Sequence, residues 1–156
     1  MPKRKPAGGG ALARAVAAVR PHTLSIATAA VLLVWIVLFV RADPTTHWGA
    51  FFGNAIADWS GTLVLILGTK FLIERGSRAS RQPTTRPRGV PAFLWEHSLT
   101  LFLIVTGAVW AVLFSRADVG GKWGQVSGNI TSEWVQMIGV VYLTKSLVER
   151  GSPERK

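Results

Sequence analysis

The chain has 156 residues, of which 49% are hydrophobic, yet 18 Lys and Arg against 8 Asp and Glu give it a formal net charge of +10. Apolar and basic residues must therefore be segregated along the chain, as in a membrane protein with basic loops. The long uncharged runs argue against a soluble nucleic-acid-binding protein, and the absence of cysteine excludes disulfides, thiolate nucleophiles and thiolate metal sites.

Residues 1–21 form a basic N-terminal segment, and an uncharged apolar run at residues 23–40 follows it. At a rise of about 1.5 Å per residue, this run nearly covers the roughly 30 Å hydrocarbon core of a bilayer and predicts a transmembrane helix. It begins too late and is too long for the apolar part of a cleaved signal peptide.

The second apolar stretch, residues 59–73, contains Lys70 and is short for a span. The preceding residues 48–58 are mostly apolar, and one helix over both stretches would be about 39 Å long, enough to cross a bilayer with tilt. An interfacial or re-entrant piece followed by a short span is the alternative, which a break at Gly61 would favour. The sequence leaves both open.

Residues 78–91 are rich in Arg and Pro and predict a disordered basic linker. The second half then follows the pattern of the first, with an apolar run at residues 98–114 and a shorter one at residues 134–148. Residues 153–156 form a short tail.

A shift of 75 residues aligns the chain with itself without a gap, and 22 of the 56 positions from His22 to Ser77 are identical to their counterparts. The identities include Trp, Gly, Asn, Lys and Glu, so duplication is the economical explanation. Repeat 1 then covers residues 22–77 and repeat 2 residues 92–152. Because each unit has two spans, the units share one orientation. The predicted fold is all-α and polytopic, with four transmembrane helices arranged as two parallel two-helix repeats.

The basic residues lie mainly before the first span, in the linker and after the last span, while the two hairpin loops carry only Arg41, Arg116 and Lys122. The positive-inside rule therefore predicts a multi-pass protein with both termini and the linker in the cytoplasm. The basic segments are interpreted as topology signals that attract anionic lipid headgroups. The lipid bilayer is thus the expected partner, and nucleic acid is not.

The motif W-G-x-x-x-G-N occurs once in each half. Glycines four residues apart share one helix face and permit close backbone approach, so helix packing is the first interpretation. An oligomer interface and a pore-lining kink are the alternatives. The glycines concerned are Gly49, Gly53, Gly124 and Gly128.

Both halves also place an asparagine and an acid four residues apart, at Asn54 and Asp58 and at Asn129 and Glu133. These belong to a polar stripe that includes Lys122 and Gln136 in the second half. The simpler interpretation puts the acids at the water interface, at a helix N-terminus. The alternative puts them inside the membrane, where a pair of carboxyl groups would form a cation or proton pathway.

The motif T-K-x-L-[IV]-E-R-G-S ends each half and predicts a Lys70–Glu74 pair one helical turn apart, with Gly76 and Gly151 as helix C-caps. Aromatic and long basic side chains near the span ends are expected to anchor the protein at the membrane interface. These anchors are Lys70, Lys145, Trp48, Trp59, Trp123 and Trp134.

His22 and His97 lie where the odd-numbered spans begin, and Glu96 adjoins the second, but their spacing matches no metal site. No nucleophile elbow, P-loop or H-E-x-x-H motif occurs. No catalytic residue, metal or cofactor is therefore predicted.

The C-terminal half resembles an uncharacterised family of small bacterial integral membrane proteins. The family pattern is N-W-x-S-E-[FY]-L-Q, an apolar helix, and Y-L-x-x-R-G-S-P-E-S-K at the end. Here the stretches from Asn129 to Gln136, from Tyr142 to Lys145 and from Arg150 to Lys156 match it, with departures at Ile130 and Arg155. The resemblance implies a bacterial inner-membrane protein and carries no assigned activity.

The sequence thus favours a small, non-enzymatic integral membrane protein that acts as an accessory or structural subunit, as a homo-oligomer or with a membrane-complex partner. A cation or proton channel or transporter that uses Asp58 and Glu133 with Asn54 and Asn129 is the alternative.

Overall fold

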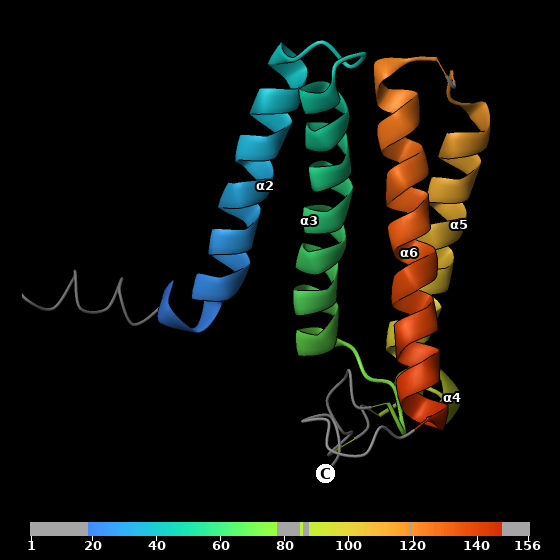
Figure 1. Cartoon of the computed structure of the whole chain (residues 1–156). Helices are drawn as coiled ribbons and strands as arrows, with labels where there is room; N and C mark the ends of the chain where they lie inside the picture. The colour runs from blue at the N-terminus through green and yellow to red at the C-terminus, as the bar shows by residue number, and fades with distance from the viewer. Residues whose placement is uncertain (1–18, 78–84, 86–87, 119, 148–156) are drawn as a thin grey trace, which may run out of the picture.

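The computed structural model describes residues 19–77, 85, 88–118 and 120–147, and this part of the chain is helical without a β-strand. Four long helices stand side by side in the spatial order α2, α3, α6, α5 (Figure 1). A single 3-10 turn precedes the first of them, and a short helix precedes the third. The elements are η1 (Arg20–His22), α2 (Thr23–Arg41), α3 (His47–Phe71), α4 (Ala92–Glu96), α5 (Ser98–Arg116) and α6 (Lys122–Ser146).

Helices α2 and α5 are each 19 residues long, and α3 and α6 are each 25. The boundaries of α5 lie 75 residues after those of α2, and the boundaries of α6 lie 75 residues after those of α3. This is the offset of the sequence identity. Helix α2 packs on α3, α5 packs on α6, and α3 packs on α6 in the middle of the row.

An aspartate in the Arg-Ala-Asp sequence shapes each hairpin turn. The Asp43 carboxylate accepts hydrogen bonds from the Thr45 N–H (2.9 Å) and hydroxyl (2.7 Å), and the Thr46 hydroxyl then caps α3 by accepting from the Gly49 N–H (3.1 Å). In the second hairpin the Asp118 carboxylate accepts from the Gly120 N–H at 3.1 Å. Short polar side chains that bond their own backbone make these turns tight.

Helix α3 runs without interruption from His47 through Gly61 to Phe71, and α6 is equally continuous. The stretches 48–58 and 123–133 therefore continue the helices that follow them, and of the two alternatives that the sequence left open, the one with a break at Gly61 is wrong. The physical reason is packing: Gly61 is buried, and an added Cβ would lie 3.2 Å from a carboxylate oxygen of Glu133 on α6. Glycine here makes room for a neighbour rather than ending a helix.

The buried core lies along the inner faces of α3 and α6 and takes only a few residues from the outer helices. Helices α2 and α5 have just 11% of their most apolar 18-residue windows buried. Large side chains such as Leu33, Val37, Val105 and Val109 are exposed. An apolar surface of this extent is unusual on a soluble monomer and ordinary on a helix in lipid.

Three of the four long helices are long and apolar enough to cross a membrane, namely α3, α5 and α2 together with η1. Helix α6 is not among them because Lys122, Asn129, Glu133, Gln136 and Lys145 make it more polar.

The predicted end of α3 needs correction. The helix ends at Phe71, so Lys70 and Glu74 do not share a continuous helix, and Gly76 lies beyond the cap position. Gly76 instead occupies a turn with φ of 85°, a backbone conformation that glycine adopts without strain. The matching Gly151, the linker residues 78–84 and 86–87, most of the N-terminal segment and the tail 153–156 lie outside the described residues.

Candidate functional site

Two groups of polar side chains are candidates for function, one halfway along the central helices and one at their C-terminal end. The first combines Asn54 and Asp58 of α3 with Asn129 and Glu133 of α6. Each acid lies about 16 Å along the axis from the start of its helix, given a rise of about 1.5 Å per residue. Neither acid is therefore at a helix N-terminus, and the interpretation that placed them there is wrong.

The central helices bring these four residues together in like pairs. The Asn129 amide donates a hydrogen bond to the Asn54 amide oxygen, and the carboxyl groups of Asp58 and Glu133 interact with each other one turn further along. The Gln136 amide donates to the Glu133 carboxyl at 3.3 Å. Two amides and two carboxyl groups at successive turns can exchange protons or hold a cation between oxygen atoms.

These pairs belong to a longer stripe, here called the central polar face. It consists of side chains of α3 and α6 that lie on one side of the line where the two helices meet. Most of its members are exposed, while Asn129 and Glu133 are half-buried between the helices. The members are Asn54, Asp58 and Thr62 on α3, and Asn129, Ser132, Glu133 and Gln136 on α6.

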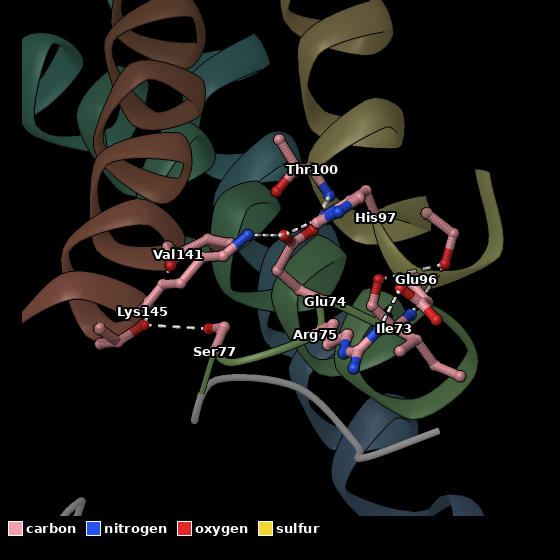
Figure 2. Close-up of polar contacts among 11 residues, drawn as sticks. Ile73, Glu74, Arg75, Ser77, Glu96, His97, Thr100, Val141 and Lys145 are labelled. Atoms are coloured by element: carbon pink, nitrogen blue, oxygen red, sulfur yellow. Dashed lines mark hydrogen bonds and ion pairs between the residues drawn. The ribbon is translucent and has the colours of Figure 1, made fainter. Parts of the chain in front are cut away.

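The second group, here called the Glu74 cluster, surrounds a carboxylate that is only 2% exposed. His97 Nδ1 lies 2.6 Å from Glu74 Oε1, Lys145 Nζ lies 3.1 Å from the same oxygen, and the Thr100 N–H donates to Oε2 at 3.4 Å (Figure 2). Glu74 follows α3, His97 and Thr100 lie at the start of α5, and Lys145 lies at the end of α6. One carboxylate thus joins three helices.

Backbone hydrogen bonds fix Glu74 in this position. The Leu99 N–H donates to the Ile73 carbonyl at 3.0 Å, and the Arg75 N–H donates to the Glu96 carbonyl at 2.7 Å. The Ser98 hydroxyl accepts from the Ile73 N–H at 2.9 Å. The chain after α3 therefore lies alongside the start of α5, as Figure 2 shows.

The electrostatics of the cluster favour an ionised Glu74. Burial raises the pKa of its carboxyl, but hydrogen bonds from Thr100, His97 and Lys145 outweigh burial and hold the pKa below its ordinary value. A cavity of about 340 Å³ adjoins the cluster, with Tyr142 and Phe93 in its wall.

The pair predicted between Lys70 and Glu74 is replaced by a contact between the two halves of the chain. Glu74 pairs with Lys145, while Lys70 Nζ lies 2.8 Å from His22 Nδ1. The matching residue Glu149 lies outside the described residues. The sequence did hold a signal, because His22, Lys70 and Glu74 recur as His97, Lys145 and Glu149.

The glycines of the W-G-x-x-x-G-N motif have different neighbours. A Cβ on Gly53 would lie 3.2 Å from the ring of Phe39, and one on Gly128 would lie 2.8 Å from the ring of Phe114, at equivalent positions of the two halves. A Cβ on Gly49 would meet the Asp43 carbonyl oxygen at 2.0 Å. Gly124 is buried beside an apolar cavity of about 540 Å³ near the hairpin turns.

The four tryptophans predicted as interface anchors differ in exposure. Trp48 and Trp123 lie in the first turns of α3 and α6 and are 69% and 53% exposed, as interfacial anchors would be. Trp134 is 4% exposed and donates from its indole N–H to the Thr106 hydroxyl at 2.7 Å. Because α6 begins at Lys122, Trp134 is halfway along it and packs inside the protein rather than at an interface. Trp59, at the matching position of α3, is half-buried.

Comparisons with family models, with curated proteins and with solved structures gave no match for this chain. Among the described residues, no group of three or more His, Asp or Glu is placed to hold a metal ion.

Proposed function

We propose that this chain is a four-span integral membrane protein that passes protons or cations, with Asp58 and Glu133 as the groups that carry them. The observation that carries the proposal is that the Asn54–Asn129 hydrogen bond and the packing of the Glu133 carboxylate over Gly61 bring the two acids to the same place, halfway along the central helices. An acid at that depth of a membrane is costly and is normally kept for proton or ion transfer or for a partner.

The proposal takes α6 as the fourth span. Its 25 residues equal the length of α3, and it packs between α3 and α5, so Ser127 is buried and Asn129 and Glu133 are partly covered by protein. The identity between the halves and the matching helix boundaries support a parallel duplication with both termini on one side of the membrane. The resemblance of the C-terminal half to small bacterial membrane proteins supports the bacterial inner membrane as its location.

The Asn54–Asn129 pair supports the same proposal. It lies one turn from the acids and offers amide oxygens and N–H groups at nearly the same depth. A proton shared by two carboxyl groups, or a cation held among carboxyl and amide oxygens, would then have a second polar layer to move into.

A flux assay in proteoliposomes tests the proposal. We expect purified wild-type protein to dissipate an imposed proton or potassium gradient faster than empty liposomes. The double variant Asp58→Asn with Glu133→Gln keeps the shape of both side chains and removes their charge, and we expect its flux to fall to the level of empty liposomes.

The control is Glu96→Gln, which removes a carboxylate from the end of the molecule, where Glu96 pairs with Arg75. Its flux should equal that of the wild type. Equal flux from wild type and double variant would overturn the proposal.

The second candidate is a non-enzymatic accessory or structural subunit of a membrane complex. The row of helices supports it, because the central polar face is left exposed and a partner could cover it. For this candidate we expect a stoichiometric complex from native membranes that is lost with Asp58→Leu and kept with Glu96→Gln. Recovery of the chain alone from such membranes would contradict it.

A further inference from the structure

No residue in the part of the chain that the structure describes covers the outer side of the central polar face. Asn54, Asp58 and Thr62 follow one another at four-residue spacing along one face of α3, and all three are exposed. Ser132 and Gln136 are exposed on the adjoining face of α6. Asp58, Thr62, Ser132 and Gln136 lie in the middle third of helices of 25 residues, and Asn54 lies about two turns from the start of α3.

In a bilayer the polar groups of this surface cannot remain in contact with lipid. A carboxyl group facing lipid near mid-depth is costly, and the amide N–H and C=O groups that the contacts within the chain leave unsatisfied add to that cost. Water does not fill the hydrocarbon core, so the groups that satisfy this face must come from protein at the same depth.

We propose that a second copy of this chain covers the central polar face, in the same orientation and related by a two-fold axis along the membrane normal. Within one chain, like groups of this face already interact, since the Asn54 amide pairs with the Asn129 amide and the Asp58 carboxyl group with that of Glu133. Amides both donate and accept, and a carboxyl group donates to a carboxylate, so the surface is self-complementary. A two-fold interface requires such self-complementarity. Because the two copies are parallel, amides face amides and carboxyl groups face carboxyl groups at the same depth in the membrane.

The dimer completes a site that each copy holds only in part. Two copies place four carboxyl groups, Asp58 and Glu133 of each, around the axis, and four amides from Asn54 and Asn129 about one turn away. Four carboxyl groups in one layer cannot all be ionised, so they share protons or hold a cation. This inference rests on the proposed function and gives its acid pair an enclosed path between two copies.

The test is the number of chains per particle in liposomes at low protein density. Because the chain has no cysteine, a single Thr85→Cys change at an exposed position carries one fluorophore per chain. We expect two photobleaching steps for this protein. A Thr62→Trp change on the central polar face should weaken dimer formation at least tenfold and leave mostly single steps.

The matched control is Val109→Trp, which adds the same ring to an exposed position of α5 facing lipid and should leave two steps. Thr62 is exposed and its hydroxyl donates to the Asp58 carbonyl of its own helix at 2.9 Å, so a larger side chain has room in the monomer. Single steps in the starting protein, or equal effects of both substitutions, would overturn the inference.

The two proposals fail separately. If the protein is a dimer but its flux does not depend on Asp58 and Glu133, the proposed interface stands and the proposed transport is wrong. If the protein is a monomer and its flux depends on these acids, the proposed transport stands and the interface is wrong. Monomers in liposomes that join a different protein in native membranes would replace the second copy with that protein.

Discussion

Glu74 is the residue on which the C-terminal end of the molecule depends. It lies after α3 and contacts side chains from α5 and α6, and it is almost fully buried. Removing one member of a buried, hydrogen-bonded group leaves its partners unsatisfied, and the cost exceeds that of breaking an exposed ion pair.

We therefore expect Glu74→Gln to destabilise the protein by about 1–3 kcal/mol. Glu96→Gln is the matched control, because Glu96 pairs with an Arg75 side chain that is 67% exposed, and it should cost less than about 1 kcal/mol. Thermal unfolding in detergent, followed by the fluorescence of the seven tryptophans, measures both. Equal losses would show that the cluster contributes no more than a surface pair.

The Glu74 carboxyl also gives the stability a pH dependence of known sign. Its pKa is lower in the folded protein than its ordinary value of 4.5, so its contribution is present above that pH and is lost as pH falls through the lower folded value. The stability difference between wild type and Glu74→Gln should hold from pH 7 to about pH 5 and shrink below about pH 4.5. Unfolding curves at each pH give this difference, and one that did not change down to pH 3 would contradict the assignment.

At the scale of helices, the long apolar runs were predictable, whereas the continuity of α3 and its end at Phe71 were not. Residues 23–40 and 98–114 are uncharged and apolar, and they form α2 and α5 because length and composition leave few alternatives. The continuity of α3 through Gly61 could not be read from the sequence, because it depends on Glu133 packing over that glycine from another helix. The same holds for the end of α3 at Phe71, which hydrogen bonds to the start of α5 support.

Among the site residues, too, the local arrangement was predictable and the contacts between distant parts of the chain were not. The spacing of Asn54 and Asp58, repeated at Asn129 and Glu133, placed each pair on one helix face, and that periodicity is local. The contact of Glu74 with Lys145 joins residues 71 positions apart. The rule that side chains four residues apart on a helix can pair predicted Lys70 as the partner of Glu74 instead. It could not predict Lys145, because only the tertiary fold brings the second half of the chain to Glu74.

Two helical glycines make a matched pair of tests for packing. A Cβ on Gly49 would lie 2.0 Å from the Asp43 carbonyl oxygen, so Gly49→Ala must displace the hairpin backbone and should cost about 1–3 kcal/mol or more. A Cβ on Gly139 would have no neighbour within 4 Å, so Gly139→Ala should be neutral or stabilise α6 by up to about 1 kcal/mol. Unfolding temperatures in one detergent compare them, and a similar loss for both would contradict the geometry at Gly49.

At the scale of the whole molecule, the number of spans decides the topology. With four spans the segment after α6 lies on the side of the linker, and with three it lies on the side of the hairpin turns. Single cysteines at Thr85 and Leu147, both exposed, and at Gly120 in the second hairpin distinguish these arrangements.

We expect a membrane-impermeant thiol reagent added to intact cells to label Gly120→Cys, and to label Thr85→Cys and Leu147→Cys only after the membrane is opened. Labelling of Leu147→Cys in intact cells together with Gly120→Cys would show that α6 does not cross. The unmodified chain is the blank, because it has no thiol.

The fit of Glu133 over Gly61 bears on the proposed duplication of the chain. Asp58 and Gly61 correspond to Glu133 and Gln136, so one half carries the shorter acid and no side chain where the other carries the longer acid and an amide. In an assembly of two identical chains, each substitution would occur on both sides of the contact at once. If the chain arose by the proposed duplication, the covalent tandem let one half lose bulk where the other gained it, so that the two halves became complementary rather than identical.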